Sequence, residues 1–200
     1  MYKYLASTAI INWHDTLIKD LAALLSDKCD SQQDIAKNCF EWVRDNIKHS
    51  YDHKLDPVTC KASDVLVHKT GYCYAKSHLL AALLRANGIP AGLCYQRLSL
   101  EGNGSPYCLH GLNAVYLEEF GWYRIDARGN KPGVDARFCP PVEKLAFLAN
   151  SKLEADLPEI WAEPLVEVVN ILIKSKTYLE VYNNLPDVEI INPKLSDWSI

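Results

Sequence analysis

Hydrophobic residues recur at helical spacing in the first quarter of the chain and predict two amphipathic helices. The first hydrophobic stripe consists of Trp13, Leu17, Leu21, Leu24 and Leu25. The second helix is expected to begin at Ser31, because Asp34 follows three residues later in a capping pattern. Its inner stripe consists of Ile35, Cys39, Trp42, Val43 and Ile47. The pattern therefore predicts that the chain opens with a layer of helices.

A longer apolar segment begins at Cys73. Leucine and alanine occupy most sides of a helix formed by residues 74–86, and a helix that is apolar nearly all round is expected to be buried. Gly88 can adopt the left-handed conformation that ends a helix, and Pro90 prevents the helix from continuing. The polar stretch before this segment is expected to be irregular, apart from a short helix at 62–67.

The hydrophobic period changes to two after Pro90, which indicates strands. Three strands are expected, over residues 91–98, 110–117 and 122–127. The last two are joined near Gly121 in an antiparallel hairpin. A final helix is expected to begin at Pro164, with a stripe formed by Leu165, Val168, Val169 and Leu172. Helices followed by an antiparallel sheet predict an α+β fold class.

The composition favours a globular protein and excludes several functional classes. The chain has 200 residues and 48% hydrophobic content, and no Gly/Ser-rich linker divides it. Its net charge is −4 without a basic stripe, so nucleic acid is not an expected partner. No apolar run approaches the ~18 residues that cross a bilayer, so no membrane contact is expected.

Cysteine usage favours a reducing cytoplasm. Seven cysteines are present, an odd number, and no C-x-x-C pair occurs among them. The apolar stretch at 4–11 has no signal-peptide cleavage pattern and is expected to belong to the mature fold.

Cys73 has an unusual position for a thiol. It stands at the start of the expected buried helix, where unpaired backbone N–H groups and the helix dipole favour an anion. A thiolate is stabilised there, and the thiolate is the nucleophilic form of cysteine. The alternative is a buried cysteine that packs as a small hydrophobic residue.

Two further polar residues stand at the ends of the expected hairpin strands. His110 starts the second strand, and Asp126 lies near the end of the third. With a hairpin loop of about three residues, His110 stands opposite Arg128 and diagonal to Asp126, roughly 7 Å apart. Side chains can span that distance, so a thiol, an imidazole and a carboxylate can meet as nucleophile, base and orienting group. Taken alone, a histidine on a strand is more often structural.

The sequence around these residues resembles that of a known family. The strings GYCYAKSHLLAALLRANGIPA, HGLNAVYL and GWYRIDARGN are similar to the core pattern of the transglutaminase-like superfamily of cysteine enzymes. Segments outside this core, such as YLASTAIINW and KASDVLVHKTGYC, resemble a bacterial branch usually described as cysteine proteases. The resemblance implies a papain-like fold, with Cys73 as nucleophile, His110 as general base and Asp126 as the carboxylate that orients the base.

The resemblance also implies a single transglutaminase-like domain over residues 1–200. The catalytic core is expected at about 31–130, with N-terminal helices and the buried Cys73 helix packed on the antiparallel sheet. The C-terminal loop and helix, at 131–200, are expected to pack on this core. The Cys73 backbone N–H is the one oxyanion donor that can be named.

Four residues near the expected triad are candidates for substrate binding: Tyr72, Lys76, Trp122 and Arg128. Lys76 shares the first turns of the helix with Cys73, where it either holds a substrate carboxylate or solvates the helix start. Arg128 either rims the cleft or pins the loop that follows Asp126. Trp122 is the tryptophan expected to line the site.

No metal or other cofactor is expected. Cys94, Cys108 and His110 lie close in sequence, but a structural zinc site requires paired ligands at short, fixed spacings. The polar residues Asp52, His53 and Asp56 are interpreted as a solvated loop.

These residues predict a cysteine-dependent hydrolase of amide bonds, a peptidase or amidase that acts through a thioester on a peptide or protein substrate. One alternative is a transglutaminase-type acyl transferase, in which an amine instead of water resolves the thioester. Hydrolysis is preferred because nothing in the sequence marks an amine site. A second alternative is a non-catalytic peptide-binding module of the same fold. The substrate and the oligomeric state are not predicted.

Overall fold

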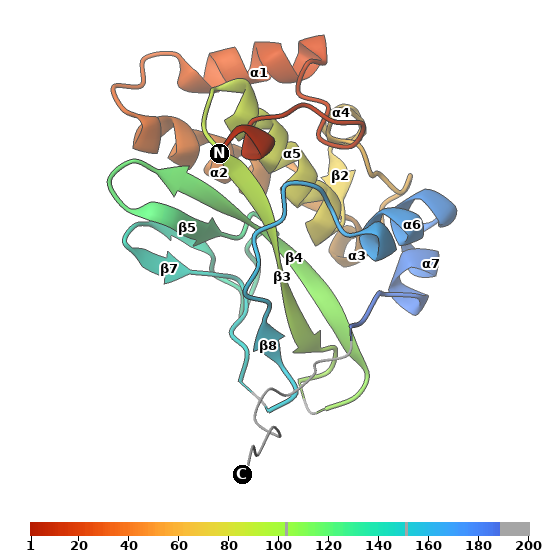
Figure 1. Cartoon of the computed structure of the whole chain (residues 1–200). Helices are drawn as coiled ribbons and strands as arrows, with labels where there is room; N and C mark the ends of the chain where they lie inside the picture. The colour runs from red at the N-terminus through yellow and green to blue at the C-terminus, as the bar shows by residue number, and fades with distance from the viewer. Residues whose placement is uncertain (103, 151, 189–200) are drawn as a thin grey trace, which may run out of the picture.

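A layer of helices and an antiparallel sheet form this protein, for which a computed structural model describes residues 1–102, 104–150 and 152–188 (Figure 1). The helices are η1 (Tyr2–Tyr4), α1 (Thr16–Ser26), α2 (Gln32–Asn46), α3 (Ser50–His53), α4 (Ala62–His68), α5 (Cys73–Ala86), α6 (Val166–Lys174) and α7 (Tyr178–Asn183). The strands are β1 (Lys48–His49), β2 (Thr70–Gly71), β3 (Ala91–Ser99), β4 (Tyr107–Leu117), β5 (Gly121–Ile125), β6 (Arg137–Cys139), β7 (Val142–Lys144) and β8 (Ala155–Asp156). The predicted α+β class is confirmed.

The main sheet has the strand order β5-β4-β3-β8 and is antiparallel throughout. Strand β4 pairs along one edge with the whole of β3 and along its other edge, through residues 113–117, with β5. The β4–β5 hairpin is the one that the sequence predicts, with Tyr116 opposite Trp122. Continued beyond the last pair of the ladder, this register sets His110 opposite Arg128, as expected.

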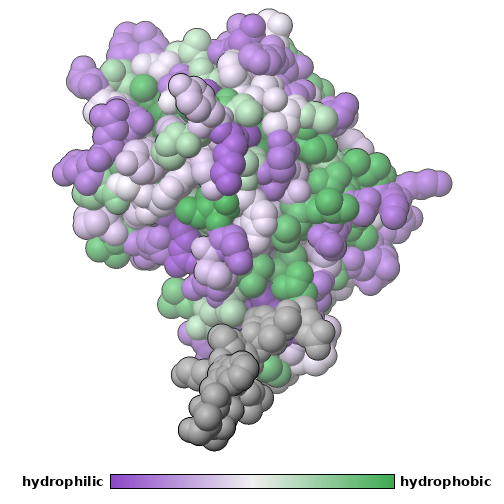
Figure 2. Space-filling model, viewed as in Figure 1, coloured by the Kyte–Doolittle hydropathy of each residue, from purple (hydrophilic) through white to green (hydrophobic). Residues whose placement is uncertain are grey.

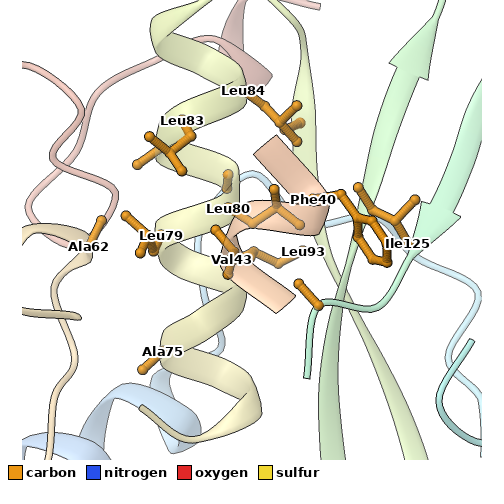
Figure 3. Packing of buried hydrophobic residues seen from close by; sticks show 14 of the residues in the cluster. Phe40, Val43, Ala62, Ala75, Leu79, Leu80, Leu83, Leu84, Leu93 and Ile125 are labelled. Atoms are coloured by element: carbon orange, nitrogen blue, oxygen red, sulfur yellow. The ribbon is translucent and has the colours of Figure 1, made fainter. Parts of the chain in front are cut away.

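Helix α5 lies between α4 on one side and the strands of the main sheet on the other (Figure 3). Every residue from Cys73 to Arg85 is buried, because α1, α2 and α4 cover one side of the helix and β3 and β4 cover the other. Leu79 lies toward Ala62 of α4, whereas Leu80 points to the opposite side (Figure 3). The helix is thus apolar on nearly all sides because it has protein on nearly all sides. Gly88 has a φ of +72°, the left-handed conformation expected after the helix.

The first two helices differ in how well their sequence predicts them. The Ser31 hydroxyl caps α2 by accepting the Asp34 N–H, as expected. The stripe expected for α1 is partly wrong, because its Leu17 is 52% exposed while Ile18 is fully buried. Asp15 caps α1 by accepting the Leu17 N–H, so Trp13 lies outside the helix. Leucines lie on more than one face of α1, and packing against α2 and α5 decides which face is buried.

The segment after β5 contains structure that the sequence did not predict, namely the β6–β7 hairpin, β8 and α7. Helix α6 begins at Val166 and not at Pro164, because Leu165 occupies the N-cap with a non-helical ψ of 140°. Its buried side consists of Val168 and Leu172, both members of the expected stripe. Residues 189–200 of the C-terminal segment expected to pack on the core lie outside the described residues.

Hydrophilic and hydrophobic side chains are mixed on the outer surface. Figure 2 shows hydrophilic residues over most of the visible face, with smaller groups of hydrophobic residues between them. Within the described part of the chain, no helix has the length and apolar character needed to cross a membrane.

Candidate active site

Cys73 is the first residue of α5 and follows β2 and Tyr72. Strand β2 pairs in parallel with β1, which fixes the direction in which the chain enters the helix. Lys76 donates its N–H to the Tyr72 carbonyl, so the N–H groups of Cys73, Tyr74 and Ala75 precede the first helical hydrogen bond. These groups and the helix dipole favour negative charge on the Cys73 sulfur.

Strand β4 comes close to the start of α5 because residue 111 is glycine. A Cβ at Gly111 would lie 2.8 Å from Tyr74 Cδ1 and 3.2 Å from Tyr74 Cα. The close approach allows the Gly111 N–H to donate to Cys73 Sγ at 3.4 Å. It also carries the neighbouring residue of β4, His110, to the sulfur.

Asp126 orients the His110 ring. Asp126 Oδ2 lies 2.7 Å from His110 Nε2, which leaves Nδ1 as the ring nitrogen available to Cys73. The carboxylate lies directly after β5, is buried, and accepts the backbone N–H of Arg128 on Oδ1 and that of Ala146 on Oδ2, both at 3.1 Å. Two backbone groups therefore fix the carboxylate, and the carboxylate fixes the imidazole.

The buried charges of this cluster shift one another's pKa values. Burial lowers the pKa of His110, but the charges of Asp126 and Cys73 and their hydrogen bonds outweigh burial and raise this pKa to about 10. Burial raises the pKa of Asp126, but the charge and hydrogen bond of His110 and the two backbone N–H groups hold it below its ordinary value. An imidazolium next to an ionised carboxylate is therefore the favoured state at neutral pH.

A pocket of about 320 Å³ lies over Cys73 and His110. Its aromatic and apolar lining comes from Tyr51, Tyr72, Tyr74, Leu98, Leu100, Leu109, Phe147, Tyr182 and Leu185. Its polar lining comes from His49, Asp52, Ser99, Cys108, Arg128 and Lys131. Asp126 is absent from the lining, because it lies behind the His110 ring. The nucleophile and base candidates thus face the pocket, and the orienting carboxylate is kept from it.

The sequence model of the transglutaminase-like superfamily matches residues 19–127, more than half of the chain. This chain belongs to the transglutaminase-like superfamily. The matched range contains Cys73, His110 and Asp126. Membership supports enzymatic activity of a thiol hydrolase or transglutaminase-like kind.

Two solved structures are similar to this transglutaminase-like protein. A "putative cysteine protease" from Cytophaga hutchinsonii is 21% identical, with a TM-score of 0.49, over 62% of this chain and 40% of that chain. The periplasmic domain of TgpA from Pseudomonas aeruginosa is 21% identical, with a TM-score of 0.47, over 63% of this chain and 46% of that chain. The match therefore spans less than half the length of either protein. No curated protein matches the chain.

Two of the four residues predicted to bind substrate line the pocket of this transglutaminase-like protein. Tyr72 and Arg128 are both in the lining. Trp122 is not, because it packs edge-on against the rings of Tyr4 and Tyr116 at the other end of the hairpin.

Lys76 is also outside the pocket and is a structural residue. Its side chain is buried, and its ammonium group donates to the backbone carbonyls of Ile47 and Arg44. Burial and the charge of Arg128 lower the pKa of Lys76 to about 7. Lys76 thus ties the start of α5 to the end of α2, and its burial away from the pocket fits neither of the two roles expected from the sequence.

Helix α3 contributes to the pocket in a way that the sequence did not predict. Asp52 does not belong to a solvated loop, because its carboxylate binds Arg128 and Lys131, at 2.7 Å in each case. His49 Nδ1 lies 3.6 Å from the same carboxylate. Arg128 and Lys131 lie 76 and 79 residues from Asp52 along the chain, so no local pattern could have paired them with it.

Metal ligands do not gather in the parts of the chain that the structure covers, 1–102, 104–150 and 152–188: these residues include no group of three or more His, Cys, Asp or Glu suited to an ion. Cys94 belongs to a small apolar cluster with Leu112, Ala114 and Leu145. Cys108 lines the pocket, and burial raises its pKa to about 12.

Proposed function

We propose that this transglutaminase-like protein hydrolyses amide bonds of peptides or proteins with a Cys73–His110–Asp126 triad. The observation that carries the proposal is the position of His110 at the pocket, between the buried Asp126 carboxylate and the Cys73 sulfur. A peptide-binding module has no need to bring a thiol, an imidazole and a carboxylate together in this order.

Acylation is the first step of the proposed reaction. Cys73 Sγ, as a thiolate, attacks the carbonyl carbon of the scissile amide, and the carbonyl oxygen becomes an oxyanion. The Cys73 backbone N–H, at the open end of α5, donates to that oxygen. The C–N bond then breaks, the His110 imidazolium gives its proton to the leaving nitrogen, and a thioester remains on Cys73.

Deacylation returns the enzyme to its starting state. His110, now neutral, takes a proton from a water molecule, and the resulting oxygen nucleophile adds to the thioester carbonyl. The C–S bond breaks, and the products are a carboxylic acid and the Cys73 thiolate beside a protonated His110. An amine that replaces water at this step would make the reaction an acyl transfer. We propose a reducing compartment such as the cytoplasm for this activity, because Cys73 must stay a thiol.

Mass spectrometry of reaction products tests the proposal. Wild type, Cys73→Ala and Cys139→Ala are incubated with a peptide library, with and without an amine donor. Cys139 is an exposed thiol on the β6–β7 hairpin, so its variant is the matched control. Mass gain of one water per cleaved bond in wild type and Cys139→Ala, but not in Cys73→Ala, is the expected result.

Two other results would change the conclusion. Addition of the amine donor in preference to water would assign the protein to the acyl transferases. Equal turnover by wild type and Cys73→Ala would refute the triad mechanism.

A further inference from the structure

The pocket over Cys73 has a charged part that the proposed chemistry does not use. Arg128 follows the orienting aspartate along the chain, and Lys131 lies three residues further on. Both line the pocket together with Asp52 of α3. The Arg128 side chain is only 9% exposed, so it is a buried charge at the pocket and not a mobile surface group.

In the cluster of Asp52, Arg128 and Lys131, the cations outnumber the anions. Asp52 Oδ2 lies 2.7 Å from Arg128 Nη1, and Asp52 Oδ1 lies 2.7 Å from Lys131 Nζ. Among the described residues that line the pocket, Asp52 is the only carboxylate. Burial and the charge of Arg128 keep the pKa of His49 well below its ordinary value, so His49 adds no charge. One unit of positive charge is therefore left over, in a chain whose net charge is −4.

The N–H donors of Lys131 also favour the binding of an anion in the pocket. Lys131 has a side chain that is 43% exposed, and an ammonium group carries three N–H donors, of which Asp52 takes one. A second carboxylate can therefore reach Lys131 from the pocket without displacing Asp52. Much of the remaining lining is apolar, including Leu98, Leu100 and Leu185, so a charge here is only partly screened by water.

We propose that the cluster of Asp52, Arg128 and Lys131 recognises a carboxylate on the substrate, so that the preferred substrates are amides that carry an acidic group beside the scissile bond. This inference rests on the proposed function, since it names the substrate class of that site. An acidic side chain or a free terminal carboxylate of a peptide both supply the group.

Alkylation of Cys73 by two small reagents tests the charge preference without a known substrate. Iodoacetate and iodoacetamide react alike: the thiolate sulfur forms a bond to the methylene carbon, and iodide leaves. They differ in carrying a carboxylate or a neutral carboxamide. The ratio of their rate constants at Cys73, mapped by mass spectrometry, therefore reports the charge that a carboxylate meets in the pocket.

A lysine with nearly the same exposure and the same ion-pair distance is available as a control. Lys144 is 44% exposed and pairs with Asp135 at 2.7 Å, as Lys131 is 43% exposed and pairs with Asp52 at 2.7 Å, but Lys144 does not line the pocket. Lys131→Glu is expected to lower the iodoacetate-to-iodoacetamide ratio by about threefold to tenfold. Lys144→Glu is expected to leave it within about twofold. Asp52→Asn is expected to raise it, because both cations lose their counter-charge.

The outcomes separate recognition from a structural role. The cluster also ties the loop after β5 to α3, and a change that only loosened this loop would slow both reagents by the same factor and leave the ratio unchanged. An unchanged ratio in Lys131→Glu, or an equal fall in Lys144→Glu, overturns the proposal. A wild-type Cys73 that reacts with iodoacetamide no faster than exposed Cys139 counts against the triad mechanism instead, and the ratio still tests the cluster.

Discussion

Replacing Gly111 by alanine tests whether the contact between β4 and α5 builds the site. Gly111 is not among the glycines with positive φ, so the cost of a side chain here is steric. The new Cβ would meet Tyr74 Cδ1 at 2.8 Å and Tyr74 Cα at 3.2 Å, whereas carbon atoms in contact lie about 3.5–4.0 Å apart. The strand must therefore withdraw by about 0.5–1 Å. Overpacking of this kind costs about 1–3 kcal/mol of folding free energy.

The withdrawal acts directly on the reacting groups. The Gly111 N–H already lies 3.4 Å from Cys73 Sγ, so a further shift breaks this hydrogen bond and carries His110 away from the sulfur. Displacements of about 1 Å in an active site cost up to about 100-fold in rate. We expect Gly111→Ala to lower the rate of Cys73 alkylation at pH 7, and any measured turnover, by about 10- to 100-fold.

Replacing a second glycine of the same sheet shows whether a loss of stability alone lowers the reactivity of Cys73. A Cβ at Gly92 in β3 would meet Ile160 Cγ2 at 2.2 Å, far from Cys73 in sequence and outside the pocket lining. Gly92→Ala should therefore lower the urea midpoint while the folded protein keeps its Cys73 reactivity. The reasoning fails if Gly111→Ala has wild-type reactivity, or if both variants lose reactivity only in proportion to the unfolded fraction.

Three further predictions concern the buried polar groups and the core. Asp126→Asn removes the charge that raises the pKa of His110, and a fall in kcat/KM on the order of 100- to 10,000-fold at pH 7, with an unchanged circular dichroism spectrum, is expected. The pKa of His110 rises on folding to about 10, so the stability that His110 contributes is lost as the pH rises from about 6.5 to 10. The pKa of Lys76 instead falls on folding to about 7, so the stability that Lys76 contributes grows as the pH rises from about 7 to 10.5. Urea titrations of Lys76→Met should therefore show a steeper loss of stability between pH 7 and 10 than wild type, and a slope equal to that of wild type would contradict the assignment. Leu80→Ala, in the fully buried centre of α5, should cost about 2–5 kcal/mol in the same titrations without any change in the iodoacetate-to-iodoacetamide ratio at Cys73.

Local patterns in the sequence are sufficient for the framework of this protein. The apolar run after Cys73 predicts a buried helix. The alternation of apolar and polar residues before Asp126 predicts a hairpin, and the length of its loop sets His110 opposite Arg128. These predictions succeed because period, capping and turn chemistry act over a few neighbouring residues. The meeting of strand and helix at Gly111 was not predictable in this way, because it depends on the Tyr74 side chain of another element.

Local sequence patterns identified the main helices and the three long strands, their order, and the place of a thiol, an imidazole and a carboxylate at element ends. Which charged residues reach the pocket depends on packing between distant parts of the chain. Lys76 and Asp52 show the difference: the lysine expected at the helix start is buried against backbone carbonyls, and the aspartate expected in solvent binds two cations over the site. Burial and ion pairing depend on the residues that packing brings together, and spacing along the chain carries no information about partners so far apart.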